Sequence, residues 1–173
     1  MAESTQQNDQ YALAAKAFGE GLSRLARGYE ADADERRDLL QNIHLALWRS
    51  LAIFDHRCSL RTWVYRVAHN VGASHVVGRR ARGSRLTTLE GLEFAVEGAT
   101  PEETVGVSEA LARVMSIVHR LKPTDRQLML LYLEDFEAAE IADVTGLSPG
   151  AVATRIHRVK ALLAAAFREA GSK

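Results

Sequence analysis

The 173-residue chain has one cysteine, three prolines and no net charge. The single cysteine, Cys58, excludes an intramolecular disulfide and is typical of a reducing compartment. No hydrophobic run is long enough to cross a bilayer, and the polar opening MAESTQQNDQ does not resemble a signal peptide. We therefore expect a cytoplasmic protein.

Signatures of catalytic and metal sites are also missing. His56 and Cys58 are two residues apart, but no CxxC or HxxxH pair accompanies them to complete a metal site. The six histidines are scattered, and neither a phosphate-binding glycine loop nor a nucleophile elbow is present. The sequence thus predicts that the protein is not an enzyme and that it uses no metal or other cofactor.

Apolar residues recur at helical spacing, whereas alternating apolar runs are absent, and 47% of the residues are hydrophobic. This pattern predicts an all-α protein. In the first half, three apolar stripes indicate three helices: Phe18, Leu22, Leu25 and Tyr29; Leu40, Ile43, Leu47 and Leu51; Leu60, Val64, Val67 and Val71. Ser59 is a plausible cap for the third of these helices.

The charge is unevenly distributed along the chain. Residues 1–82 carry 12 Lys and Arg against 9 Asp and Glu, residues 83–107 carry 1 against 5, and residues 108–173 carry 9 against 8. This division predicts two small helical domains, at 1–82 and 108–173, joined by an acidic linker at 83–107. Because phosphate neutralisation drives much of non-specific DNA affinity, so balanced a chain should bind DNA weakly alone.

Three capping patterns place the starts of helices in the second half. Thr100-Pro101-Glu102-Glu103 is a capping box with proline at the first helical position, and it predicts a helix that ends near Lys122-Pro123. Thr124 and Gln127 predict a second capping box, for a short helix. Ser148 can cap a further helix, with Pro149 at its first position.

The segment Glu140 to Leu163, EIADVTGLSPGAVATRIHRVKALL, has the layout of a helix-turn-helix. Gly146 suits the turn, where positive φ is often needed. On the second helix, Val152, Ile156, Val159 and Leu163 have the spacing of a buried face, which leaves Thr154, Arg155, His157 and Arg158 facing outward. On spacing alone, an ordinary amphipathic helical hairpin is the alternative.

Two longer stretches resemble bacterial sigma factors of RNA polymerase. LKPTDRQLMLLYLEDF, AEIADVTGLS and GAVATRIHRVKALL resemble the promoter-reading C-terminal domain. DLLQNIHLALWRSLAIFDHRCSLRTWVYRVAHNVGASHVVGRRAR resembles the domain that binds core polymerase and reads the −10 element, in matching order. A chain with only these two domains is similar to the extracytoplasmic-function (ECF) group, and the resemblance covers roughly residues 11–170.

The resemblance implies a promoter-specificity subunit that grips the polymerase clamp through an Asp-x-x-Gln-Glu pattern. Asp38 and Gln41 match that pattern, Asn42 replaces the acid, and Leu45 lies within two turns of the same helix. An exposed ion pair at this position would contribute only about 0.2–1 kcal/mol, so we expect core binding to survive its loss.

The resemblance also assigns residues to the −10 element. Asn70 matches the position near the flipped-out base, and Trp63, Arg66 and Asn70 share one helical face suited to a single strand. Taken by itself, Trp63 is favoured as a core residue over a stacking platform for a base. The three arginines that end the block are expected to contact phosphates: Arg79, Arg80 and Arg82.

For the −35 element, the matching positions are on the second helix of the helix-turn-helix: Ala153, Thr154, Arg155, His157 and Arg158. Arg158 is suited to guanine or to phosphate, and Thr154 and His157 offer shorter hydrogen bonds. Ala151 and Ala153 depart from the threonine and the basic residue frequent there, which leaves the −35 preference open.

The implied partners are core RNA polymerase, promoter DNA and an anti-sigma factor. In the family the acidic linker runs toward the RNA exit path, and Glu90, Glu93, Glu97, Glu102 and Glu103 suit such a role; a solvated tether is the alternative. Two other classes of protein are alternatives. A sigma-like decoy that binds regulators without initiating transcription is favoured only by Asn42 and the zero net charge. A plain helix-turn-helix repressor would leave the segment RTWVYRVAHN unexplained.

Overall fold

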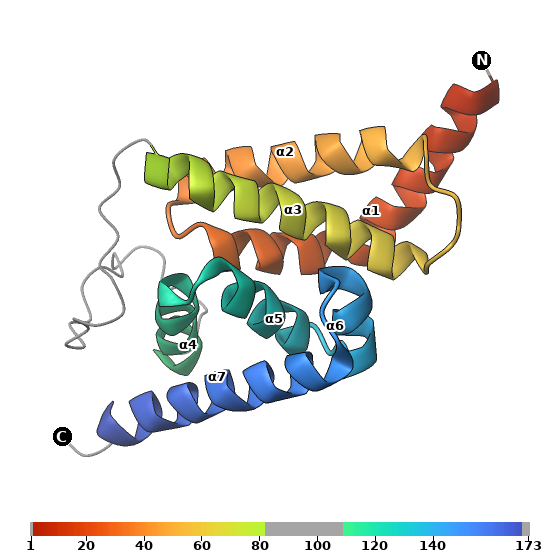
Figure 1. Cartoon of the computed structure of the whole chain (residues 1–173). Helices are drawn as coiled ribbons and strands as arrows, with labels where there is room; N and C mark the ends of the chain where they lie inside the picture. The colour runs from red at the N-terminus through yellow and green to blue at the C-terminus, as the bar shows by residue number, and fades with distance from the viewer. Residues whose placement is uncertain (1, 82–108, 171–173) are drawn as a thin grey trace.

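Residues 2–81 fold into three helices that pack against one another (Figure 1). In the computed structural model, which describes residues 2–81 and 109–170, α1 spans Ala2–Tyr29, α2 spans Ala33–Leu51 and α3 spans Leu60–Ala81. The predicted apolar stripes meet between these helices. Five of their side chains are at most 1% exposed: Leu22, Leu25, Ile43, Leu47 and Val64.

Side-chain caps mark where α2 and α3 begin. The Asp32 carboxylate accepts from the backbone N–H groups of Asp34 and Glu35, at 3.0 and 2.9 Å. Ser59 Oγ accepts from the backbone N–H of Thr62 at 3.0 Å, which confirms the cap predicted for the third helix. Both caps satisfy amides that the first turn of a helix leaves without partners.

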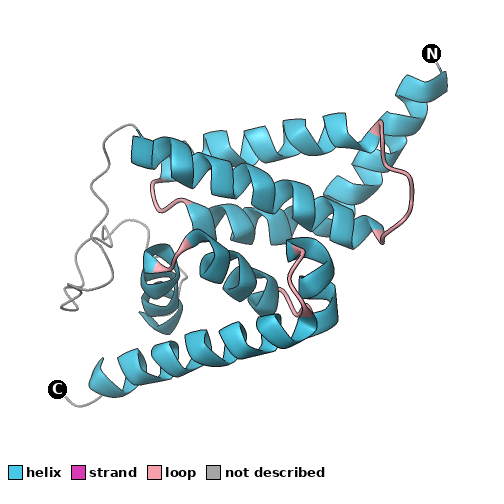
Figure 2. Cartoon of the chain, viewed as in Figure 1, coloured by secondary structure: helices cyan, strands magenta, loops and turns pink. Residues whose placement is uncertain are grey.

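Residues 109–170 form four further helices, joined by short loops (Figure 2): α4 at Glu109–Arg120, α5 at Pro123–Leu133, α6 at Ala138–Thr145 and α7 at Pro149–Ala170. The helix-turn-helix formed by α6 and α7 is confirmed. Gly146 has φ 75°, and Ser148 Oγ accepts from the backbone N–H of Ala151 at 3.3 Å.

One predicted cap in this half is wrong. Thr124 and Gln127 do not open α5, which starts at Pro123 with Lys122 as its N-cap and no side-chain capping bond. Proline has its φ preset and lacks the N–H that a cap would satisfy, so the helix begins before Thr124. The helix start predicted at Thr100 and the acidic linker 83–107 lie outside the described residues.

The described residues form no strand, as the all-α prediction requires. The two halves pack against each other through α4, α5 and α6. Leu130 of α5 lies over Gly28 of α1 so closely that a Cβ at position 28 would be 2.2 Å from Leu130 Cδ2. Phe136, in the loop before α6, is 3% exposed, and its ring meets the Tyr65 ring edge-on at 4.8 Å. The Arg61 guanidinium lies 3.7 Å from the centre of the Phe136 ring.

The side chain of Glu134 adds polar contacts between the two halves. Glu134 accepts from Arg24 Nε and Nη2 at 2.6 and 2.8 Å, and from the Tyr65 hydroxyl at 3.1 Å. Its backbone oxygen accepts from Arg61 Nη2 at 2.7 Å. The side-chain hydrogen bonding that Arg24 donates to Glu134 raises the pKa of Arg24, and this ion pair joins α1 to the residue that follows α5.

Candidate nucleic-acid and partner interfaces

One face of α2 combines exposed acidic, amide and apolar side chains. Its members, spaced three or four residues apart, are all exposed, and Leu45 is 44% exposed although it is apolar: Asp38, Gln41, Asn42 and Leu45. The opposite face of the same helix supplies buried residues to the core. An exposed leucine among hydrogen-bonding groups is suited to a protein partner rather than to DNA.

On α3, Trp63 is fixed against its own domain. Its ring is half-buried and packs on Phe54 with centroids 5.2 Å apart, while Nε1 donates to Ser50 Oγ at 3.0 Å. Because the indole N–H already has a partner, Trp63 can offer DNA only the accessible part of its ring.

The next turns of α3 carry the two other residues predicted for the −10 element. Asn70 is exposed. Arg66 donates from Nη2 to the backbone oxygen of Asp143 in α6 at 2.6 Å, so its guanidinium contacts the C-terminal domain. In this arrangement the shared face predicted for Trp63, Arg66 and Asn70 is open at Asn70 and partly covered at Arg66.

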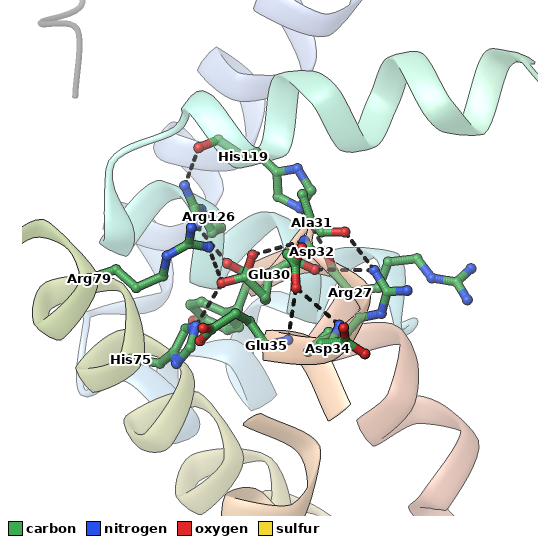
Figure 3. A network of polar contacts seen from close by, with 12 residues as sticks. Arg27, Glu30, Ala31, Asp32, Asp34, Glu35, His75, Arg79, His119 and Arg126 are labelled. Carbon is green, nitrogen blue, oxygen red and sulfur yellow. Dashed lines mark hydrogen bonds and ion pairs between the residues drawn. The ribbon is translucent and has the colours of Figure 1, made fainter. Parts of the chain in front are cut away.

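Arg79 neutralises a buried acid, a partner that sequence reasoning missed. Glu30 at the end of α1 is 2% exposed; Arg79 forms an ion pair with its carboxylate, and His75 Nε2 lies 2.8 Å from it (Figure 3). Burial raises the pKa of Glu30, but the hydrogen bonds from His75 and Arg79 outweigh burial and hold it below its usual value. The side chain of Arg80 and all of Arg82 lie outside the described residues.

Behind Asn70, a histidine is enclosed in the core. His69 is 1% exposed, and its Nδ1 lies 2.9 Å from the Tyr29 hydroxyl. Burial lowers its pKa to about 3, so the ring is neutral at physiological pH. The described residues give its Nε2 no hydrogen-bond partner. The exposed Asn70 therefore directly follows a residue of α3, His69, whose side chain is fixed in the core.

The outer face of α7 carries the residues predicted for the −35 element. Ala153, Thr154, His157 and Arg158 are exposed, as expected, while Arg155 is half-buried. Thr154 Oγ1 donates to the backbone oxygen of Gly150 at 3.0 Å, which orients its hydroxyl along the helix. The face is thus accessible and carries two cations.

Both of these arginines approach one acid on α5. Asp125 is 7% exposed; its Oδ2 accepts from Arg158 Nη2 at 2.9 Å, and its Oδ1 lies 3.6 Å from Arg155 Nη1. An open hollow of about 640 Å³ lies beside them, lined by the first turns of α5 and α7 and by Lys122. The cations around this hollow suit phosphate oxygens.

Sequence reasoning did not identify Asp125. Its only local signal is its place in the first turn of a helix, where acids are common. The pairing with an arginine 33 residues later depends on how α5 packs against α7.

The described residues contain no group of three or more His, Cys, Asp or Glu side chains placed to hold a metal ion. Within the same residues, no helix is both long enough and apolar enough to be a candidate for a membrane span.

Family comparisons match both halves of the chain. Sigma-70 region 2 matches residues 15–82, and Sigma-70, region 4 matches residues 111–163. The RNA polymerase sigma factor CnrH of Cupriavidus metallidurans is 31% identical over 85% of this chain and 81% of its own length. The RNA polymerase sigma factor NccH of Alcaligenes xylosoxydans xylosoxydans is 27% identical over 95% of this chain and 91% of its own length.

Two solved structures share the fold. CnrH in complex with the cytosolic domain of CnrY aligns with a TM-score of 0.68 at 24% identity, covering 97% of this chain and 96% of that one. The sigma factor RpoE in complex with the anti-sigma factor NepR, from Bartonella quintana, aligns with a TM-score of 0.66 at 20% identity, covering 93% and 96%. Together with the matches in both halves, the sequence relatives show that this chain belongs to the ECF group of RNA polymerase sigma factors.

Proposed function

We propose that this chain acts as an ECF sigma factor with three separate surfaces. The exposed face of α2 binds core RNA polymerase, α3 reads and melts the −10 region, and α7 binds the −35 element. The observation that carries the proposal is the exposure of Asn70 on one domain and of Arg158 on the other. Two reading surfaces on separate domains suit two separated promoter elements.

Core binding is assigned to the α2 face because it joins an exposed leucine to acidic and amide groups. The variant with Asp38→Ala and Leu45→Ala should form less complex with purified core enzyme than the wild type. Glu20→Ala is the matched control, since Glu20 on α1 has a 97% exposed side chain and lies outside this face. If wild-type protein recovers no core enzyme in a pull-down, the assignment fails.

The −10 assignment centres on Asn70, whose amide can both donate to and accept from a base edge. Asn70→Ala should impair strand opening at the −10 region, followed by permanganate footprinting of unpaired thymines, while core binding is retained. Equal loss of both activities would instead indicate misfolding. Arg66 contacts α6 here, so its use on the same strand requires the two domains to separate.

The −35 assignment centres on Arg158, which is exposed and carries several donors. Arg158→Ala should cost about 1–3 kcal/mol of holoenzyme affinity for a promoter with an intact −35 element. The same variant should bind unchanged to a fragment whose −35 region has been replaced. Unchanged affinity for both fragments would refute the assignment.

We further propose cytoplasmic action, where polymerase and DNA are found, and inhibition by an anti-sigma factor. The solved relatives support the second point, because one title names CnrY as the partner and the other names NepR as an anti-sigma factor. A decoy that binds regulators without initiating transcription is the alternative, and transcription with purified core enzyme distinguishes the two.

A further inference from the structure

We infer that Asp125 is a positioning residue for −35 recognition: its carboxylate holds Arg158, and secondarily Arg155, in the orientation in which they meet DNA. The inference rests on the proposed function of α7. It adds a residue that is itself buried, at 7% exposure, and belongs to a different helix from the reading face.

Two arginines of the recognition helix α7 offset the free-energy cost of burying the Asp125 carboxylate. A buried carboxylate is costly unless it is paired and hydrogen-bonded. Among the described residues, the ion pairs of Asp125 are to Arg158 at 2.9 Å and Arg155 at 3.6 Å, both on α7. Oδ1 has no hydrogen bond there, so its charge is met by the longer contact with Arg155. The acid and the two arginines therefore form one unit.

The contact leaves Arg158 available to a ligand. Its side chain is 63% exposed although one Nη2 donor is bound to Asp125. A guanidinium has five N–H donors in a fixed plane, so anchoring one of them orients the others. An anchored arginine side chain has already lost part of its rotamer entropy, so it loses less on binding a base. Fixing the plane favours bidentate recognition of guanine over looser phosphate contact.

Arg155 supplies the second half of the arrangement. Its side chain is 39% exposed and lies one turn before Arg158, on the side nearer Asp125 Oδ1. It keeps a second positive charge beside the carboxylate while the remaining donors of Arg158 meet DNA. The hollow lined by Lys122, Arg155 and Arg158 then remains cationic as phosphates approach.

A role in positioning differs from a role in stability. If Asp125 only ties α5 to α7, its loss should weaken folding and all DNA binding together. If it positions Arg158, its loss should reduce discrimination between −35 sequences, while affinity for unrelated DNA is kept or increased. The removal of a negative charge near the phosphates favours that increase.

The test measures holoenzyme binding to a promoter library whose −35 region is randomised and whose −10 region is constant. The promoter is first identified by transcription of genomic fragments. Asp125→Asn is compared with Arg158→Ala, with the double variant and with Asp143→Asn. The last removes one carboxylate from an exposed position on α6. Thermal unfolding is measured in parallel for every variant.

We expect Asp125→Asn to lower the affinity ratio between the best and the substituted −35 sequences about three- to tenfold, part of what one bidentate base contact provides. The double variant should lose no more than Arg158→Ala alone, since residues that act as one unit are not additive. Asp143→Asn should behave as wild type. If Asp125→Asn unfolds, Asp125→Glu keeps the charge but displaces the carboxylate, and it should still lower the ratio.

Other outcomes overturn the inference. Wild-type discrimination in Asp125→Asn, with loss in Arg158→Ala, leaves the proposed function standing and removes the role of Asp125. Wild-type discrimination in both variants removes the −35 reading by Arg158 as well. Parallel losses of unfolding temperature, specific affinity and non-specific affinity in Asp125→Asn would assign it a structural role only.

Discussion

Replacing Glu134 with alanine should loosen the contact between the two domains without unfolding either. The carboxylate is 10% exposed, and it accepts two hydrogen bonds from Arg24 of α1 and one from Tyr65 of α3. All three bonds cross between the domains. Glu134→Ala removes them while keeping the backbone oxygen that accepts from Arg61.

The expected loss of free energy depends on how exposed each hydrogen-bond partner of Glu134 is. Arg24 is 59% exposed, so its pair with Glu134 is screened by solvent and contributes about 0.2–1 kcal/mol. The partly buried hydrogen bond that the Tyr65 hydroxyl donates to the Glu134 carboxylate contributes about 1.5 kcal/mol. The total is about 2 kcal/mol, which corresponds to roughly a 30-fold fall in the ratio of closed to open molecules, since 1.4 kcal/mol is tenfold.

Single-molecule energy transfer between dyes at the exposed positions 16 and 164, in a Cys58→Ser background, measures that ratio directly. Glu20→Ala is the control, because Glu20 lies 3.9 Å from the same arginine but belongs to its own helix α1. A closed-to-open ratio within twofold of wild type in Glu134→Ala would refute the reasoning. So would an equal change in Glu20→Ala.

Two further predictions concern stability. Gly28→Ala should weaken the packing of α5 on α1, because its Cβ would lie 2.2 Å from Leu130 Cδ2. Gly19→Ala meets nothing within 4 Å and should gain up to about 1 kcal/mol of stability from helix propensity. Urea unfolding of both variants measures the two changes in the free energy of unfolding. Because the folded-state pKa of His69 is about 3, only the unfolded chain binds this proton between pH 6.5 and 3, so stability should fall by up to about 1.4 kcal/mol per unit as the pH drops through that window. His69→Gln should reduce this slope and the exposed His157→Gln should not, when unfolding is followed from pH 7 to 5; equal slopes in all three proteins would contradict the assignment.

Local signals predicted the helix-turn-helix well. Ser148 caps the start of α7, and Gly146 adopts the left-handed conformation at the end of α6; the sequence predicted both. The start of α5 was misplaced because two local signals compete there. Pro123 at the first helical position prevailed over a capping pattern at Thr124.

The partners of the functional arginines were not predictable from local pattern. Arg79 meets Glu30, 49 residues earlier, and Arg66 meets a backbone oxygen 77 residues later. Each contact depends on how helices from distant parts of the chain pack. Periodicity indicated which arginines face outward, but it could not show which of them already neutralise a buried acid.

The central claim is that this chain directs core RNA polymerase to promoters through two reading surfaces. Transcription in vitro with purified core enzyme on genomic fragments tests it most directly, by comparing wild type with Asn70→Ala and Arg158→Ala. The account predicts defined transcripts that require the wild-type chain, with Asn70→Ala impaired at every promoter and Arg158→Ala impaired most where the −35 element matters. Binding of the chain to core enzyme without any transcript that depends on it would contradict the claim.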